Sequence, residues 1–199
     1  MQAGPRHYDR RAREAALVEA AAAVFAEVGY EAATTRLVGQ RAECSEGLIH
    51  TYFGGKEGLL RAVLAQRAGR ASRQPAPAVV ADLSLDLSAM MRFSIAMLHR
   101  ERRFLRVAFS RALVDDKAAK LLDAELHERR AKAFAERLKI HDAAGRIGEG
   151  HDLKLVAASL ATVAYGAGFV GREVLGHSRR RAIAHATAAT RLVARSLAI

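Results

Sequence analysis

Three consecutive polar side chains, His50, Thr51 and Tyr52, have the chemistry to contact a nucleic acid. An imidazole, a hydroxyl and a phenol can each exchange hydrogen bonds with phosphates or with the edges of bases. Apolar residues lie among them at helical spacing, namely Leu48, Ile49 and Phe53. We therefore expect a helix with one apolar face that packs inward and one polar face that points at a groove.

The elements that would position this helix precede it directly in the chain. A helix is expected around Val38 and Ala42, and a short turn with Glu43 and Cys44 follows it. Ser45 stands where a side-chain oxygen would cap the next helix. Two helices separated by so short a turn predict a helix-turn-helix, whose second helix reads the major groove of DNA.

A longer helix upstream would brace this hairpin. Its apolar residues recur at helical spacing and are Leu17, Ala21, Val24, Phe25 and Val28. Gly29 follows them, where a left-handed residue would end the helix. Because a single helical hairpin is a common packing unit, the bracing helix strengthens the prediction of a DNA reader.

Together these segments resemble the amino-terminal DNA-binding domain of the TetR family of repressors. The resemblance lies in ARxxALVxAAxxVFAEVGYEAATT and then SEGLIHTYFGGKEGLL, and it covers about residues 10 to 70. The positions in register with the family pattern are Phe25, Gly29, Tyr30, Thr34, Ser45, Gly47, Phe53, Lys56, Glu57 and Leu59. The resemblance implies an all-α chain, with a three-helix helix-turn-helix domain followed by a larger helical domain for ligand binding and dimerisation.

The resemblance also implies which residues contact DNA. Lys56 and His50 would hold phosphates, and Glu46 would face a base edge or a sugar. The Glu46 carboxylate itself repels phosphate, but it could accept a hydrogen bond from a cytosine amino group. The implied DNA-binding residues are Thr34, Thr35, Arg36, Ser45, Glu46, Gly47, His50, Thr51, Tyr52 and Lys56.

Three positions depart from the family pattern. His50 replaces a tyrosine that contacts a phosphate in many relatives, Glu43 stands where the turn often has glycine, and Gly39 stands where alanine is usual. A neutral histidine donates one hydrogen bond to a phosphate and a protonated one binds better. We therefore expect the DNA affinity to depend on pH.

Net charge alone does not support DNA binding. The chain carries a formal charge of +11, but the segment through Arg73 holds 11 basic against 8 acidic residues. Between Glu14 and Glu57 the balance is three basic against seven acidic residues. The arginines near the amino terminus would form either a basic arm on DNA or a solvated tail, and they are Arg6, Arg10, Arg11 and Arg13.

Composition favours one soluble helical protein of the cytoplasm. Of the 199 residues 51% are hydrophobic, only three are proline, and no alternating β-type run competes with the helical periodicity. A single cysteine, Cys44, excludes an internal disulfide and suits a reducing compartment. The stretch from Leu153 to Leu175 is interrupted by glycines and charges, so we do not expect a membrane span.

The SRQPAPAV segment after Ala71 marks the expected domain boundary. Residues 1–71 would form the DNA-binding domain, with 1–12 as a flexible arm, and residues 72–199 the ligand-binding and dimerisation domain. Helices are expected at about 56–71, 83–98 and 104–114, then from Asp115 or Asp116 to Gly145, and finally at about 152–175 and 179–197.

The last two helices carry an apolar seam at heptad-like steps, which we expect to join a second copy of the chain. The expected interface residues are Val156, Leu160, Val163, Ala167, Val170, Val174, Ile183, Thr190 and Val193. The alternative is that these helices only close the core of one subunit. Flexible and aromatic side chains that would line an effector pocket are Met90, Phe93, Met97, Phe109, Phe134, Tyr165 and Phe169.

The motifs that could indicate catalysis or cofactor binding lack the sequence context that those functions need. Gly166, Gly168 and Gly171 match a dinucleotide fingerprint, but a helix precedes them instead of the required strand. The histidines lack the spacing of a metal site, and nothing places Ser110, Asp115 and His99 together as a triad. We expect neither an enzyme nor a resident cofactor or metal.

These observations predict a homodimeric transcription regulator, most simply a repressor that a small, mostly apolar molecule releases from operator DNA. The alternative is a helical small-molecule-binding or protein-interaction module that does not bind DNA, which the acidic balance of the helix-turn-helix leaves open.

Overall fold

A computed structural model describes residues 5–72 and 74–198, which form helices and connecting loops without a β-strand. The all-helical prediction is confirmed. The chain divides into two compact units. The first unit comprises Met1–Ser72 and Arg103–Leu121, and the second comprises Arg73–Arg102 and Leu122–Ile199.

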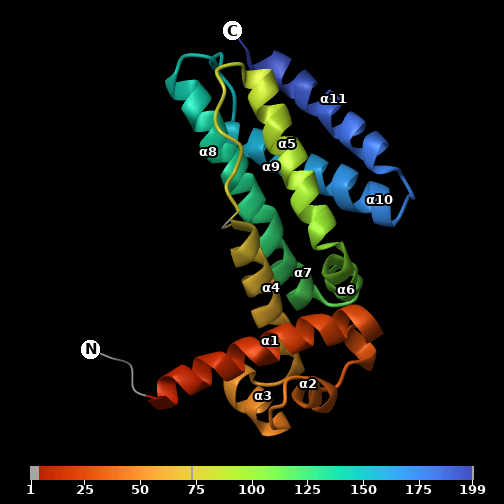
Figure 1. Ribbon diagram of the computed structural model, residues 1–199. Coiled ribbons are helices and arrows are strands. Elements are labelled where there is room, and N and C mark those ends of the chain that lie inside the picture. The colour runs from red at the N-terminus through yellow and green to blue at the C-terminus, as the bar shows by residue number, and fades with distance from the viewer. Residues whose placement is uncertain (1–4, 73, 199) are drawn as a thin grey trace. The chain divides into compact units, whose positions relative to one another are not determined.

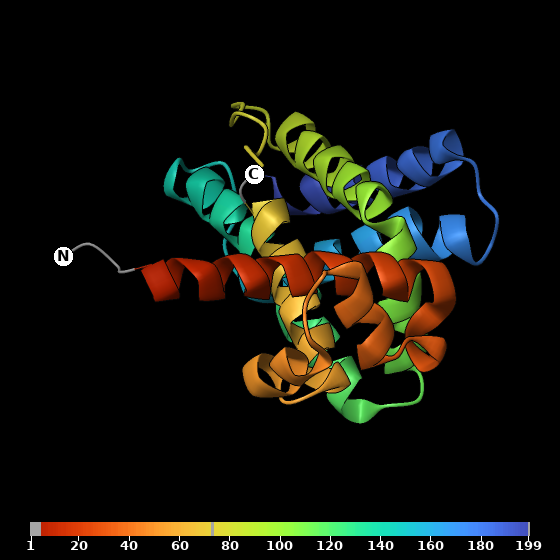
Figure 2. The ribbon, with the colours of Figure 1, turned by 60° about the horizontal axis from the view of Figure 1, so that its bottom comes forward.

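Four helices begin the first unit: α1 (Pro5–Ala32), α2 (Thr35–Arg41), α3 (Glu46–Phe53) and α4 (Lys56–Ser72). Figures 1 and 2 show α2 and α3 packed beneath α1, with α4 leaving from the end of α3. The predicted apolar faces meet in the core of this unit, where the side chains of Leu17, Phe25, Val38, Ile49 and Leu59 are fully buried. Burial of these side chains fixes the helical hairpin against the bracing helix.

Local residue chemistry sets the ends of these helices. The Thr34 hydroxyl accepts a hydrogen bond from the Leu37 backbone N–H at 3.1 Å and caps α2. Ser45 occupies the cap position of α3, but its hydroxyl makes no capping bond, so the predicted side-chain cap is wrong. Gly29 takes the expected left-handed φ of 81° and interrupts α1, after which helical backbone continues to Ala32.

The amino-terminal arm differs from expectation. Helix α1 already begins at Pro5, so residues 5–12 are helical and not a flexible arm. Residues 1–4 of the expected arm lie outside the described residues. Within α1, Arg10 and Arg13 form ion pairs one turn along the helix, with Glu14 at 2.8 Å and Asp9 at 2.7 Å. Such pairs favour helix over a disordered tail.

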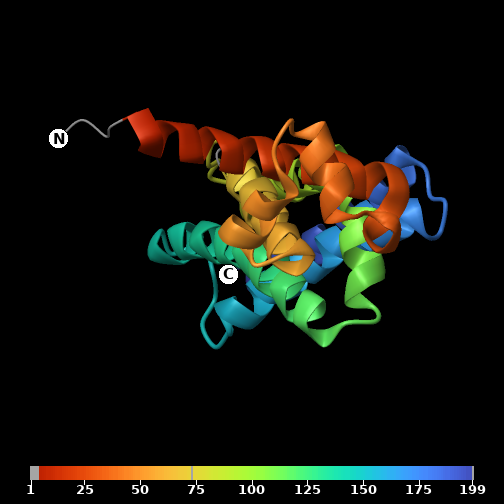
Figure 3. The same ribbon diagram turned by 90° about the horizontal axis from the view of Figure 1, so that it is seen from below.

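Helices α6 (Arg102–Ala112) and α7 (Asp116–Leu122) complete the first unit, and Figure 3 shows the loop that joins them. Asp115 caps α7, because its Oδ1 accepts from the backbone N–H groups of Lys117 at 2.9 Å and Ala118 at 3.3 Å. A single boundary after residue 71 was expected, but residues 103–121 cluster with the amino-terminal helices. The expected division into 1–71 and 72–199 therefore missed this segment.

The second unit contains α5 (Leu83–Arg100), α8 (Arg129–Ala143), α9 (Leu153–Tyr165), α10 (Gly171–Glu173) and α11 (Arg179–Leu197). Two π-helical segments, η1 (Asp123–Glu128) and η2 (Gly166–Val170), join neighbouring helices. Helices α5 and α11 run side by side in opposite directions, and α8 packs on α9 (Figure 1). The glycine triplet lies in η2 and at the start of α10, with no preceding strand.

A charged network lies in the core of the second unit. The carboxylate of Asp86, 1% exposed, accepts from Arg137 Nη1 at 3.1 Å and from the Val80 backbone N–H at 3.0 Å. Its other oxygen lies 3.0 Å from Nε2 of His141, which is 0% exposed. Arg146 Nε donates to Nδ1 of His141 at 3.0 Å, which leaves Nε2 to donate its hydrogen to Asp86. Arg137 also donates to the Pro77 carbonyl at 2.6 Å and ties the proline-containing loop to α5 and α8.

Candidate nucleic-acid interface

The turn between α2 and α3 is closed by two unusual residues. Glu43 takes a left-handed φ of 52°, and the Cys44 backbone N–H donates to the Gly39 carbonyl at 3.0 Å. A Cβ at position 39 would lie 3.0 Å from the Cys44 carbonyl oxygen, so glycine allows the turn to fold back closely on α2. The left-handed residue at 43 and the glycine at 39, both departures from the family pattern, thus serve the same tight turn.

The other end of α3 is fixed just as closely. Gly54 ends the helix with a left-handed φ of 71°. A side chain at position 58 would place its Cβ 1.7 Å from the Phe53 carbonyl oxygen, so only glycine allows α4 to start directly over the end of α3. Helix α3 is therefore held between a tight turn and a tight corner, and its exposed face has a defined orientation within the first unit.

The ten predicted DNA-binding residues all reach the surface of the first unit. Thr35, Tyr52 and Lys56 are half-buried, and the exposed members are Thr34, Arg36, Ser45, Glu46, Gly47, His50 and Thr51. The residues come from the start of α2, the length of α3 and the start of α4. The ten side chains thus come from one continuous segment of the chain, as expected for a helical hairpin that contacts a DNA groove.

Several of these side chains already have partners. The Thr35 hydroxyl donates to Glu46 Oε1 at 2.5 Å, which links the starts of α2 and α3. The Thr51 hydroxyl donates to the Gly47 carbonyl at 2.9 Å. Arg36 is exposed and makes no ion pair with any residue in the described part of the chain. Arg36 is therefore a cation of this surface that is free to meet a phosphate.

Arg10 joins this surface from the first turns of α1. Its guanidinium carbon lies 5.1 Å from the centroid of the Tyr52 ring, and the ring of Phe53 packs edge-on against Tyr52 at 6.3 Å. Arg10, which the sequence predicted to lie in a basic arm or a solvated tail, therefore helps to position Tyr52 of α3. Its contact with Tyr52 could not be anticipated from sequence spacing.

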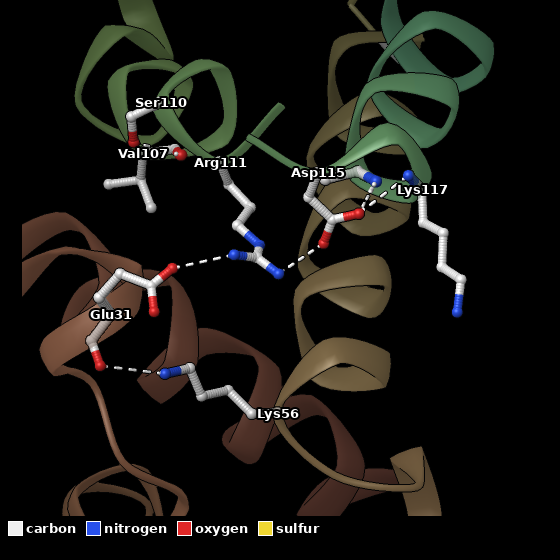
Figure 4. Close-up of polar contacts among 8 residues, drawn as sticks. Glu31, Lys56, Val107, Ser110, Arg111, Asp115 and Lys117 are labelled. Atoms are coloured by element: carbon white, nitrogen blue, oxygen red, sulfur yellow. Dashed lines mark hydrogen bonds and ion pairs between the residues drawn. The ribbon is translucent and has the colours of Figure 1, made fainter. Parts of the chain in front are cut away.

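Lys56 lies at a corner where α1, α4 and α6 meet (Figure 4). Its Nζ donates to the Glu31 carbonyl at 3.2 Å and lies 4.4 Å from the centroid of the Tyr30 ring. The guanidinium of Arg111 lies on the same ring at 5.1 Å. Burial raises the pKa of the Tyr30 phenol, and the Arg111 charge opposes that rise. The predicted phosphate ligand is thus held at the carboxyl end of α1.

Arg111 bridges two helices in that corner. Figure 4 shows its guanidinium between two carboxylates: Nη1 donates to Glu31 Oε1 at 3.0 Å and Nη2 donates to Asp115 Oδ2 at 2.5 Å. Burial is the largest single influence on the Asp115 carboxyl and raises its pKa. Hydrogen bonds from the α7 backbone and from Arg111 together outweigh burial, so the pKa of Asp115 is lowered. Arg111 was not predictable from the sequence, because its partner Glu31 lies 80 positions away.

The acidic residues of the helix-turn-helix region form ion pairs with arginines, most of which come from other parts of the first unit. Glu14 pairs with Arg10, Glu19 with Arg67 and Arg70, Glu27 with Arg41, Glu31 with Arg111, and Glu57 with Arg61. All but Arg41 of these arginines lie outside the window from Glu14 to Glu57. The count of three basic against seven acidic residues therefore overstates the negative charge that DNA would meet.

Comparison with known proteins agrees with this arrangement. Residues 17–63, which span the bracing helix, the hairpin and the start of α4, match the family model of the bacterial regulatory proteins of the tetR family. The amino-terminal domain is a TetR-family domain. The resemblance stated for about residues 10 to 70 is confirmed. A search of curated proteins found no matching relative.

Solved structures show that the whole chain has the fold of TetR-family regulators. A protein from Mesorhizobium loti, assigned to this family, has a TM-score of 0.76 at 19% identity, with 96% of this chain and 98% of that chain covered. The flavonoid-responsive regulator FrrA has a TM-score of 0.74 at 21% identity, with 94% and 97% covered. The fatty acid degradation regulator FadR from Bacillus halodurans has a TM-score of 0.69 at 18% identity, with 98% and 97% covered.

The side chains expected to line an effector pocket divide between the two units. Met90, Met97, Phe134, Tyr165 and Phe169 are buried in the second unit. Phe93 is half-buried in the same unit, whereas Phe109 is half-buried in the first. Arg130 lies over the Tyr165 ring at 4.7 Å, and burial raises the pKa of the Tyr165 phenol.

The expected interface residues are also divided. Leu160 is 1% exposed and Thr190 is 0% exposed, with the Thr190 hydroxyl bonded to the Ala186 carbonyl at 2.8 Å. These two side chains pack inside the subunit, so they offer no surface to a second copy. The other members are half-buried or exposed, namely Val156, Val163, Ala167, Val170, Val174, Ile183 and Val193.

Proposed function

We propose that the protein is a DNA-binding transcription regulator, most simply a repressor. The observation that carries this proposal is the α2–turn–α3 hairpin, whose polar residues all stay at the surface while its apolar residues close the core. Arg36 would contact a phosphate, and Thr51 and Tyr52 would face base edges or sugars. Lys56 would add a phosphate contact from the start of α4, since an ammonium has three donors and only one meets Glu31.

We propose a homodimer, because two reading helices are needed to grip two half-sites of a duplex. Large apolar side chains stay exposed on α9, η2 and α11 and in the turn after α10, and they are Leu155, Val170, Val174, Leu175 and Leu192. Val170 and Val174 belong to the expected seam, while Leu155 and Leu192 replace the buried Leu160 and Thr190 as candidates. The two readers would meet half-sites about one helical turn, or a multiple of it, apart.

We propose that a small, mostly apolar effector binds within the second unit and releases the regulator from DNA. The methionine and phenylalanine side chains of α5, α8 and η2 supply an adaptable apolar environment. FrrA and FadR, which share the fold, are named for flavonoids and fatty acids, and such molecules are largely apolar. The effector must prefer the conformation that does not fit DNA, because equal affinity for both would shift nothing.

This function places the protein in the cytoplasm and assigns it no enzymatic step. One helix, Leu153–Glu173, is long and apolar enough to cross a membrane, but the core helix of a soluble protein passes the same test. The rival function is a helical binding module without DNA affinity. The rival function was supported by the acidic balance of the helix-turn-helix. That support is weaker because arginines pair with the acidic residues.

The experiment that separates the two functions is selection of binding fragments from random duplex DNA, followed by a salt titration of the selected sequence. A regulator should enrich a sequence with two related half-sites, and its affinity should fall steeply with salt as phosphate contacts release counterions. A module without DNA affinity should enrich nothing at low salt.

A further inference from the structure

The first unit contains a cleft whose lining includes none of the ten residues predicted to contact DNA. It has a volume of about 240 Å³ and lies where α1 ends and α4 begins, against α6 and α7. Its lining residues are Tyr30, Glu57, Leu60, Arg61, Arg111, Asp115, Lys117, Ala118, Lys120 and Leu121. Drug-sized ligands occupy pockets of about 300–1,000 Å³, so this cleft fits a smaller molecule.

The floor of the cleft is apolar. Leu60 and Tyr30 are buried side chains of the core beneath it, and Ala118 and Leu121 supply half-buried apolar surface from α7. A planar or compact hydrocarbon body could displace water from this floor, which is favourable in proportion to the apolar area covered. The floor therefore selects for the apolar part of a ligand.

The rim of the cleft carries more cations than its own carboxylates balance. Arg61, Arg111, Lys117 and Lys120 stand against Glu57 and Asp115. Both acids are engaged, Asp115 with Arg111 at 2.5 Å and Glu57 with Arg61 at 3.8 Å, and Arg111 also pairs with Glu31 beside the cleft at 3.0 Å.

The two lysines provide the unbalanced charge. Lys117 and Lys120 are exposed, and neither ammonium group forms an ion pair within residues 5–72 and 74–198. They lie three positions apart on α7, so both side chains project from neighbouring positions of one helix. Figure 4 shows the Lys117 ammonium extending away from the Asp115 cap, while its backbone N–H serves that cap.

The geometry points to a second small-molecule site in this cleft, for a small organic anion with an apolar body such as an aromatic carboxylate. The ring of the ligand covers Leu60, Tyr30 and Leu121, and its carboxylate accepts charge-assisted hydrogen bonds from Lys117 and Lys120. This site goes beyond the proposed function, because it lies in the first unit and not among the effector-binding residues proposed for the second.

The test uses the full-length protein with benzoate as the probe and benzamide as its neutral counterpart of the same shape. Affinity is measured by equilibrium dialysis, and the site is located from backbone amide shifts in the nuclear magnetic resonance spectrum. Benzoate should bind saturably and shift the amides of residues 57–61 and 117–121. Benzamide should bind about fivefold to tenfold more weakly, as expected for the loss of two partly exposed charge pairs.

Variants separate this cleft from general charge effects. Lys117→Gln combined with Lys120→Gln should weaken benzoate binding by about the same fivefold to tenfold. The matched control is Lys132→Gln combined with Lys154→Gln, which removes two exposed lysines from the second unit and should leave the affinity unchanged. Ala118→Phe, which fills the floor, should abolish the shifts at residues 57–61.

Three results would overturn the proposal: equal affinities for benzoate and benzamide, equal loss in the lysine pair and its control, or shifts confined to the second unit. None of these measurements involves DNA, so failure of the cleft leaves the proposed repressor function untouched.

Discussion

The two units differ in whether charged residues enter the core: among the described residues, buried charged side chains occur in the second unit alone. In the first unit the ion pairs lie on the surface, some within one helix and others between helices, and the polar face of α3 remains open. In the second unit Asp86, Arg137 and His141 form a fully enclosed network in the core. Polar residues on the open face of α3 are therefore accessible to a partner, while those of the buried network hold the fold of the second unit.

The largest effect should come from breaking the buried network. Asp86→Ala leaves Arg137 buried without its carboxylate, and loss of one partner of a buried pair typically costs about 3–5 kcal/mol of unfolding free energy. Denaturant unfolding followed by circular dichroism measures this cost. Glu136→Ala, which removes a surface partner of Lys139, should cost less than about 1 kcal/mol. Equal losses in the two variants would show that the network does not hold the core.

The next effect concerns the apolar surface of the second unit. Val174 is 69% exposed and Leu192 is 67% exposed, so Val174→Glu combined with Leu192→Glu should leave each subunit folded. If these side chains meet a second copy, two unpaired carboxylates in an apolar interface should weaken the dimer about tenfold or more. Sedimentation velocity against protein concentration measures the change. A variant that remains as fully dimeric as the parent protein would place the interface elsewhere.

A smaller effect is expected on the open face of the first unit. Arg36→Ala should lower the slope of log affinity against log salt by about one, because one phosphate contact is lost. Its unfolding free energy should not change, since Arg36 makes no ion pair in the described part of the chain. Thr51→Ala should instead change the preferred sequence. Arg41→Ala is the comparison variant for Arg36→Ala, because Arg41 is already paired with Glu27 whereas Arg36 is unpaired in the described part of the chain. A slope unaffected by Arg36→Ala would remove this residue from the interface.

The smallest effect is a pH dependence in the second unit. Burial and then the charges of Arg172, Arg102 and Arg179 lower the pKa of His99 from its ordinary value of 6.5. The unfolded chain therefore binds more protons below pH 6.5, so stability should fall as the pH is lowered through that value. His99→Gln should flatten the profile of unfolding free energy between about pH 5 and pH 7. An unchanged profile would show that His99 does not contribute to it.

Elements governed by local chemistry were predictable from the sequence. Asp115 caps a helix where the sequence predicted one to begin at Asp115 or Asp116, and Gly29 has the left-handed φ that its residue type predicted. Periodicity also identified the apolar faces of α1 and α3. Ser45 shows the limit of this reasoning, because a cap-forming residue type does not settle whether its hydroxyl bonds to the helix.

Features that depend on distant contacts were not predictable. The periodicity of α9 and α11 shows which residues are apolar, but not whether the same chain covers them, so Leu160 and Thr190 were assigned to a partner. Arg111 reaches Glu31 across 80 positions, and no spacing rule connects them. For the same reason the segment Arg103–Leu121 could not be assigned to the first unit from sequence.

The central claim, that the open face of the first unit reads DNA, is tested most directly by the salt dependence of binding to a duplex selected from random sequences. We predict a steep linear fall of log affinity with log salt for the parent protein, and a slope reduced by about one in Arg36→Ala. Failure of the parent protein to select or bind any duplex at low salt would contradict the claim.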